Sequence, residues 1–103
     1  MPTQPDKDVS RDSIVTVTQV QVSCEVNSET VILHFDSGEY FGLNDVGTLV
    51  WKMIEQPRSV SELRDAILRD YEVDADQCER DLLDLLGELR DRGLIEVRNL
   101  TAA

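Results

Sequence analysis

The spacing of apolar residues changes its period at Asn44, and this change constrains the fold of the 103-residue chain more than any other feature. Before Asn44, apolar and polar side chains alternate, which is typical of half-buried β-strands. After Asn44, apolar residues recur every three or four positions, as on one face of an α-helix. A chain of this length can bury one core. The sequence therefore predicts one α+β domain, with a three-stranded antiparallel sheet followed by three helices.

The alternating part begins at Ile14, and its phase slips near Thr18–Gln19, which predicts a bulge or bend. Turn-forming residues follow at 26–30, and a second strand is expected at 30–35, with Val31, Leu33 and Phe35 on one face. The segment Asp36–Gly38 has the residues of a tight hairpin turn. Residues 1–13 lack periodicity and are expected to form a disordered arm before a domain at 14–98, with a frayed tail at 99–103.

The third strand, Glu39–Leu43, is short and apolar. Alternation predicts that Phe41 and Leu43 point inward, while Tyr40 and Gly42 point the opposite way. Glycine in a strand marks either the close approach of another backbone or, here, a simple bend before a helix. If this strand is a sheet edge, its unpaired N–H and C=O groups can receive another strand.

Capping residues divide the second part of the chain into three helices. Asn44 or Asp45 caps the first helix, and Pro57 ends it. Ser59 and Glu62 form a capping box for the second, which runs to about Tyr71. A third helix is expected at about 75–92, with Asp74 and Gln77 as its capping pair and Gly93 as its C-terminal signal. The segment 94–97 is expected to form a short strand or a packed tail.

The apolar stripes of these helices predict the core. The first helix presents Val46, Leu49, Val50, Met53 and Ile54, with Trp51 on the flank; the second presents Val60, Leu63, Ile67 and Tyr71; the third presents Cys78, Leu82, Leu85, Leu86 and Leu89. We therefore expect Cys78 to be a buried thiol, and the strand pattern gives the same expectation for Cys24.

Composition and motifs argue against catalysis and against anionic partners. Twenty-one acids and ten bases give a formal net charge of -11, which disfavours nucleic acids and anionic membranes and suits a basic partner or simply a soluble surface. Two distant cysteines and one histidine, His34, offer no metal site, and no cofactor is expected. No signal peptide or membrane span is predicted, so we infer the cytosol. Phosphate-binding and nucleophile motifs are absent, so no catalytic residue is assigned.

The last two helices resemble a helix-turn-helix pair, which raises the alternative of a transcription regulator. The third helix with its cap carries seven acids against three arginines. Such a helix would be repelled by the phosphates that border a major groove. The fold type and the function are therefore separate questions.

The stretches "GEYFGLNDVGTLVWKMIE" and "SVSELRDAILRDYEVDADQCERDLLDLLGELRDRGLIEV" together resemble the PqqD-like family of RiPP recognition elements, proteins that bind ribosomally made precursor peptides. The resemblance rests on G-x-Y-x-x-L-N followed by a tryptophan, a Ser-capped second helix, an acidic third helix and a closing Gly-Leu. It covers residues 14–97 and is greatest to the stand-alone proteins of lasso-peptide pathways.

The resemblance implies a winged helix-turn-helix fold and a non-catalytic protein that binds the leader segment of a precursor. The leader would lie antiparallel on the third strand, beside the third helix, before transfer to a separate leader peptidase. The implied leader is basic, with Tyr, Pro and Leu anchors. The expected peptide-binding residues are Glu39, Tyr40, Phe41, Gly42, Leu43, Cys78, Asp81, Leu82, Asp84, Leu85 and Glu88. A second possibility within the family is a peptide chaperone for pyrroloquinoline quinone biosynthesis, which would pair with a radical enzyme.

Overall fold

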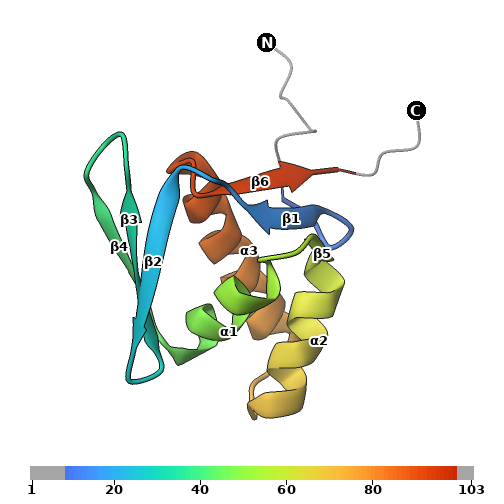
Figure 1. Cartoon of the computed structure of the whole chain (residues 1–103). Helices are drawn as coiled ribbons and strands as arrows, with labels where there is room; N and C mark the ends of the chain where they lie inside the picture. The colour runs from blue at the N-terminus through green and yellow to red at the C-terminus, as the bar shows by residue number, and fades with distance from the viewer. Residues whose placement is uncertain (1–8, 100–103) are drawn as a thin grey trace.

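A computed structural model describes residues 9–99, and this part of the chain forms three helices and two three-stranded antiparallel sheets (Figure 1). In chain order the elements are β1 (Ile14–Val17), β2 (Gln21–Val26), β3 (Glu29–His34), β4 (Tyr40–Leu43), α1 (Asp45–Met53), β5 (Arg58–Ser59), α2 (Val60–Asp70), α3 (Ala75–Asp91) and β6 (Ile95–Arg98). The α+β class is confirmed. The expected order of strands before helices is incomplete, because β5 precedes α2 and β6 follows α3.

The second sheet, in the order β5-β1-β6, was not predicted. β1 is its central strand, with Ile14 opposite Ser59 on one side and Val17 opposite Ile95 on the other. The chain then leaves this sheet after Val17 and enters the other sheet at Gln21. The phase slip near Thr18–Gln19 therefore marks a change of sheet.

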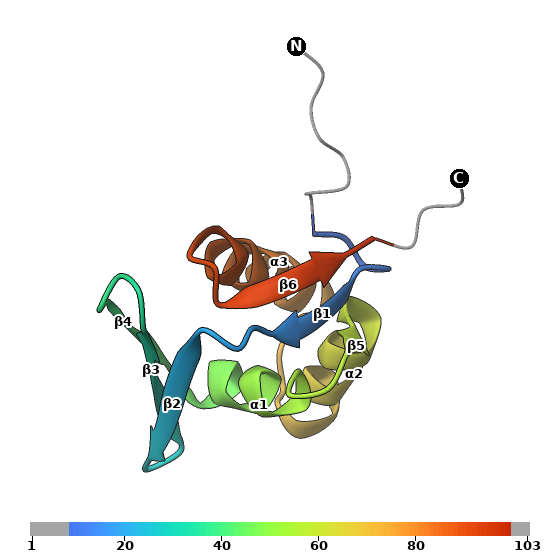
Figure 2. The same ribbon diagram turned by 45° about the horizontal axis from the view of Figure 1, so that its top comes forward.

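The sheet in the order β2-β3-β4 contains the second and third predicted strands and only the second half of the alternating segment that begins at Ile14. Its register places Val31 opposite both Cys24 and Gly42. Both hairpin turns need positive φ: Asn27 and Ser28 have φ values of 53° and 68°, and Gly38 has 70°. Figure 2 shows this sheet at the left of the molecule, and the three helices lie to its right.

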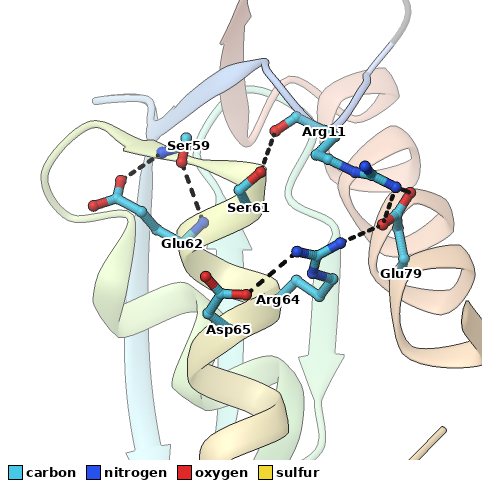
Figure 3. Close-up of polar contacts among 7 residues, drawn as sticks. All are labelled: Arg11, Ser59, Ser61, Glu62, Arg64, Asp65 and Glu79. Carbon is cyan, nitrogen blue, oxygen red and sulfur yellow. Dashed lines mark hydrogen bonds and ion pairs between the residues drawn. The ribbon is translucent and has the colours of Figure 1, made fainter. Parts of the chain in front are cut away.

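Each helix begins at the residue type that favours a cap. Asn44, and not Asp45, caps α1, since its side chain accepts a hydrogen bond from the Gly47 N–H at 2.9 Å. Both bonds of the capping box at Ser59 and Glu62 are present (Figure 3). Asp74 caps α3 by accepting from the N–H of Gln77 at 2.9 Å. Local sequence thus sets the start of every helix.

The core lies between the helices and the inner faces of the two sheets. Its buried members are Val15, Ile32, Leu43, Val50, Trp51, Ile54, Val60, Leu63, Ile67, Cys78, Leu82, Leu86, Leu89, Leu94 and Ile95. Two polar contacts join α1 to the β2-β3-β4 sheet: Trp51 Nε1 donates to Ser23 Oγ at 3.1 Å, and the hydroxyl groups of Thr30 and Thr48 lie 2.8 Å apart. None of the helices described is long and apolar enough to cross a membrane.

Part of the expected arm is hydrogen-bonded to α2, since the Arg11 carbonyl accepts from the Ser61 hydroxyl at 3.2 Å (Figure 3). Ser13 is buried, and its carbonyl accepts from the Val60 N–H at 3.0 Å. Arg11 contacts Glu79 of α3 at 3.0 Å. The expected arm and tail otherwise fall at 1–8 and 100–103, outside the described residues.

Cys24 is exposed, so the prediction of a buried thiol is wrong there and right at Cys78. Alternation placed Cys24 with Val22 and Val26 on one face of β2, and all three are exposed. The face of β3 that carries Val31 is also open, while Ile32 on the opposite face is buried. Alternation groups residues by face, but it does not say which face the helices cover.

Candidate functional site

The candidate site begins at β4, which is an edge strand of its sheet. The His34 N–H donates to the Glu39 carbonyl at 3.0 Å. In an antiparallel ladder, hydrogen-bonded and non-hydrogen-bonded pairs alternate. Phe41 and Leu43 therefore direct their backbone groups at β3, and we infer that Tyr40 and Gly42 direct theirs at the open edge. Two N–H groups and two carbonyls are thus placed to pair with an incoming strand.

A pocket of about 340 Å³ opens beside the C-terminal end of β4. The pocket is lined by three apolar or weakly polar residues of α3 that were predicted to belong to the site: Cys78, Leu82 and Leu85. Its remaining lining residues are Asn44, Val46, Gly47, Val50, Ile67, Val73, Gln77 and Asp81. The volume lies at the small end of the range for ligand pockets, and the lining is mostly apolar with a few polar groups, as such pockets usually are.

Most of these additional lining residues were absent from the sequence-based site. Val50 and Ile67 were expected only in the core, and Gln77 only as part of a cap. The pocket forms where α1, α2 and α3 converge, so its lining depends on tertiary packing. The apolar periodicity of these three helices was visible in the sequence, but periodicity does not distinguish the wall of a pocket from a filled core.

The other end of β4 is connected to the end of α3 through Arg92. Its guanidinium group lies 3.7 Å from the carboxylate of Glu39 and 3.5 Å from that of Glu88. The same group lies over the Phe41 ring, 5.1 Å from its centroid. The pocket contains Asn44, next to the last residue of β4, and Cys78 in the first half of α3. The strand and the helix therefore run in opposite directions, with the pocket at one end and Arg92 at the other.

The three acids of α3 that were predicted to lie at the site have different neighbours in the structure. Asp81 lines the pocket and accepts a hydrogen bond from Gln77 Nε2 at 2.8 Å. Glu88 faces Arg92 near the start of β4. Asp84 is exposed and is not among the residues that line the pocket. The structure thus places Asp81 and Glu88 at opposite ends of the site, and all three acids are exposed.

The surroundings of the pocket change the protonation of one of its lining groups, the Cys78 thiol. Burial raises the pKa of the Cys78 thiol, with Arg64 opposing this effect through its positive charge. Because the thiolate is the reactive form, a raised pKa keeps Cys78 neutral and weakly nucleophilic near neutral pH. Within residues 9–99, no group of three His, Cys, Asp or Glu side chains is arranged to hold a metal ion.

An open strand edge beside an apolar pocket is the arrangement that proteins use to bind an extended peptide by strand addition. The family model for coenzyme PQQ synthesis protein D (PqqD) matches residues 29–95, and the chain belongs to this family. No curated protein matches the sequence closely enough to count as a relative.

Two solved structures have the same fold. One is TbiB1 in complex with the TbiA(beta) leader peptide, which is 36% identical, covers 85% of this chain and 99% of its own, and superposes with a TM-score of 0.73. The other is a lasso peptide synthetase B1 complexed with the leader peptide, at 24% identity, 80% and 96% coverage and a TM-score of 0.71. The first supports both family and fold, and the second supports the fold.

Proposed function

We propose that this protein is a RiPP recognition element that binds the leader segment of a ribosomally made precursor peptide. The observation that carries the proposal is the open edge of β4, which ends next to the pocket lined by α1, α2 and α3. Backbone pairing supplies affinity for an extended peptide, and the pocket supplies specificity for its side chains. The 36% identical TbiB1 structure, which is a complex with a leader peptide, supports this assignment.

The antiparallel pairing that the family resemblance implies gives the bound peptide a direction. A leader antiparallel to β4 starts near Leu43 and ends near Tyr40. Its upstream part lies beside the pocket that contains Leu85, and an apolar anchor of the leader enters there. Its downstream part leaves past Arg92 and Glu39. The precursor region to be processed therefore emerges at the Arg92 end of the site.

In this proposal the protein is not an enzyme, and it presents the bound precursor to a separate leader peptidase. The helical part is a winged helix-turn-helix that does not bind DNA, because the acidic surface of α3 opposes a phosphate backbone. The acids at the site, Asp81 and Glu88, favour a leader that carries lysine or arginine. A peptide chaperone for quinone-cofactor synthesis is the second candidate, favoured by the PqqD family match.

The test is a titration of the full chain with the fluorescently labelled leader of the precursor gene that lies beside its own gene. We expect saturable binding and no cleavage of the leader by this protein alone. A leader of the same composition in scrambled order is the control and should not bind. No binding of the native leader would reject the proposal. A neighbouring radical enzyme in place of a leader peptidase would favour the second candidate.

A further inference from the structure

A cluster of charged side chains outside the proposed peptide site joins three parts of the chain (Figure 3). We call it the Glu79 cluster and define it by Arg11, Arg64 and Glu79. Glu79 Oε1 accepts hydrogen bonds from Arg11 Nη2 at 3.0 Å and from Arg64 Nη1 at 2.8 Å. Arg11 precedes β1, Arg64 belongs to α2, and Glu79 belongs to α3. One carboxylate therefore ties the N-terminal segment to two helices.

Two carboxylates compete for the Arg64 side chain. Its guanidinium group lies 2.8 Å from Glu79 on α3 and 3.4 Å from Asp65 on its own helix. The side chain is 25% exposed, and its Nε is covered and has no hydrogen-bond partner among residues 9–99, so much of the side chain lies against the protein. Arg11 contacts both oxygens of Glu79, at 3.0 and 3.1 Å, and holds them in place for Arg64. Arg11 thus favours the bridge between α2 and α3 over the pair within α2.

The Glu79 cluster lies close to two walls of the pocket. Cys78, which precedes Glu79, lines the pocket from α3, and Ile67, three residues after Arg64, lines it from α2. Residues three apart are neighbours on the surface of a helix, and one turn contains 3.6 residues. The bridge therefore holds α2 and α3 within one helical turn of residues that form the pocket walls.

We propose that Arg11 is a positioning residue of the leader site. It is not among the residues that line the pocket, and it acts through Glu79 and Arg64 by fixing the spacing of α2 and α3. This inference rests on the proposed function, in which an apolar anchor of the leader enters the pocket. Without the Arg11 contact, Arg64 can turn to Asp65, and the two walls are no longer held at one spacing. The leader must then order the walls as it binds, which lowers its affinity.

A change of the Arg11 side chain tests the cluster without detaching the segment that carries it. The Arg11 carbonyl accepts from the N–H and the hydroxyl of Ser61 at 3.1 and 3.2 Å, and the Ser13 carbonyl accepts from the Val60 N–H at 3.0 Å. None of these contacts involves the Arg11 side chain. Only Nη2 of Arg11 donates to Glu79, so the single ammonium group of a lysine can replace it.

The test titrates full-length Arg11→Gln, Arg11→Lys and the original protein with the labelled leader. We expect Arg11→Gln to bind about two- to fivefold more weakly, the factor that corresponds to one exposed ion pair, and Arg11→Lys to bind as the original does. Arg69→Gln removes an exposed arginine from α2 and is the control, which should not weaken binding. The direction of the effect separates positioning from net charge, because loss of a positive charge should by itself strengthen the binding of a basic leader.

Amide hydrogen exchange measures the same effect without any leader. The Cys78 N–H donates to the Asp74 carbonyl at 2.8 Å in the first turn of α3, and the Val17 N–H donates to the Ile54 carbonyl at 3.0 Å at the end of β1. Arg11→Gln should speed exchange at Cys78 by about two- to fivefold through local opening and leave exchange at Val17 unchanged. A saturating leader should slow exchange at Cys78 in the original protein.

The possible results separate this inference from the proposed function. If the original protein does not bind the leader, the proposed function is rejected, and the exchange measurement still tests the effect of Arg11 on α3. Equal leader affinities of Arg11→Gln and the original, or equally weak binding by Arg11→Gln and Arg11→Lys, overturn the positioning role. Unchanged exchange at Cys78 overturns it as well. Exchange that rises equally at Cys78 and Val17 would assign Arg11 to the stability of the whole fold and would also overturn it.

Discussion

The guanidinium group of Arg92 lies over the ring of Phe41, 5.1 Å from the ring centroid. Arg92 follows the last residue of α3, and Phe41 is in the middle of β4, so one contact joins the end of the helix to the edge strand. The ion pair of Arg92 with Glu39 strengthens the same connection, and its pair with Glu88 lies within the end of α3. The contact fixes one end of the space in which a peptide is proposed to lie.

Replacing Arg92 with glutamine should remove the ring contact and both ion pairs. An exposed cation–π contact contributes about 0.5–1 kcal/mol and an exposed ion pair about 0–1 kcal/mol. We therefore expect the free energy of unfolding to fall by about 1–2 kcal/mol in urea denaturation. Arg98→Gln removes an exposed arginine from β6 and serves as the control. Equal stability of the original protein and Arg92→Gln would show that the contact does not hold the edge strand.

Gly42→Pro tests strand addition at the open edge. Proline deletes the Gly42 N–H, which we infer to face the peptide, and one lost hydrogen bond costs about 0.5–1.5 kcal/mol. We expect leader affinity to fall at least severalfold. The control is Gly42→Ala, which keeps the N–H and adds a Cβ that would meet nothing within 4 Å. If a folded Gly42→Pro protein, checked by circular dichroism, binds as well as Gly42→Ala, pairing at this edge is wrong.

The helices could be predicted because the signals that start and end them are local. Asn44, Ser59 and Asp74 lie within three residues of the backbone groups that they cap. Gly93, with a φ of 76°, ends α3 as its sequence position indicated. Short-range hydrogen bonds and conformational preferences decide such positions, and both can be read directly from the residues.

The features that escaped prediction depend on contacts distant in sequence. β5 has only two residues and pairs with β1 far earlier in the chain, so it has no periodicity of its own. The apolar alternation around Cys24 could not reveal which face the helices would cover. The position of Arg92 over Phe41 likewise follows from how α3 packs against the sheet. The edge position of the strand that contains Gly42, in contrast, was a condition stated from the sequence, and the sheet order β2-β3-β4 meets it.

Leu85→Ala distinguishes a pocket wall from a core position. Leu85 is half-buried, lines the pocket and packs against the core, whereas its neighbour Leu86 is fully buried. We expect Leu85→Ala to weaken leader binding and to cost less stability than Leu86→Ala, for which about 2–5 kcal/mol is typical. The melting temperatures and the leader dissociation constants of both variants show whether Leu85 is a pocket residue or a core residue. A large thermal loss for Leu85→Ala with unchanged affinity would remove this residue from the site.

The pair of arginines around Glu79 predicts a specific pH dependence of stability. Hydrogen bonds from Arg11, and then from Arg64, hold the pKa of Glu79 below its ordinary value of 4.5. A carboxylate with a lowered pKa stabilises the fold above its unfolded pKa and loses that effect as the pH falls through its folded pKa.

Glu79→Gln should therefore melt at a lower temperature than the original protein above about pH 5, and the difference should shrink as the pH falls below 4.5. Thermal melting followed between pH 3 and 7 measures this difference. Glu72→Gln removes an exposed acid elsewhere and should not show the same pattern. A difference between Glu79→Gln and the original that stays constant across this range would mean that the arginine contacts do not stabilise the fold.

The acids of α3 should act mainly on the rate of leader association. Asp81 lies at the pocket and Asp84 on the exposed side of the same helix, so their field reaches a basic leader before contact. Exposed charges contribute about 1 kcal/mol or less each and change association more than dissociation. Asp81→Asn/Asp84→Asn should slow association and flatten its salt dependence in stopped-flow measurements. Glu55→Gln/Glu96→Gln removes two exposed acids outside the site and is the control. Because the Debye length falls from about 10 Å at 0.1 M salt to about 3 Å at 1 M, all rates should converge at high salt. Equal association rates for the α3 double variant and the original at low salt would identify these two acids as general surface charge.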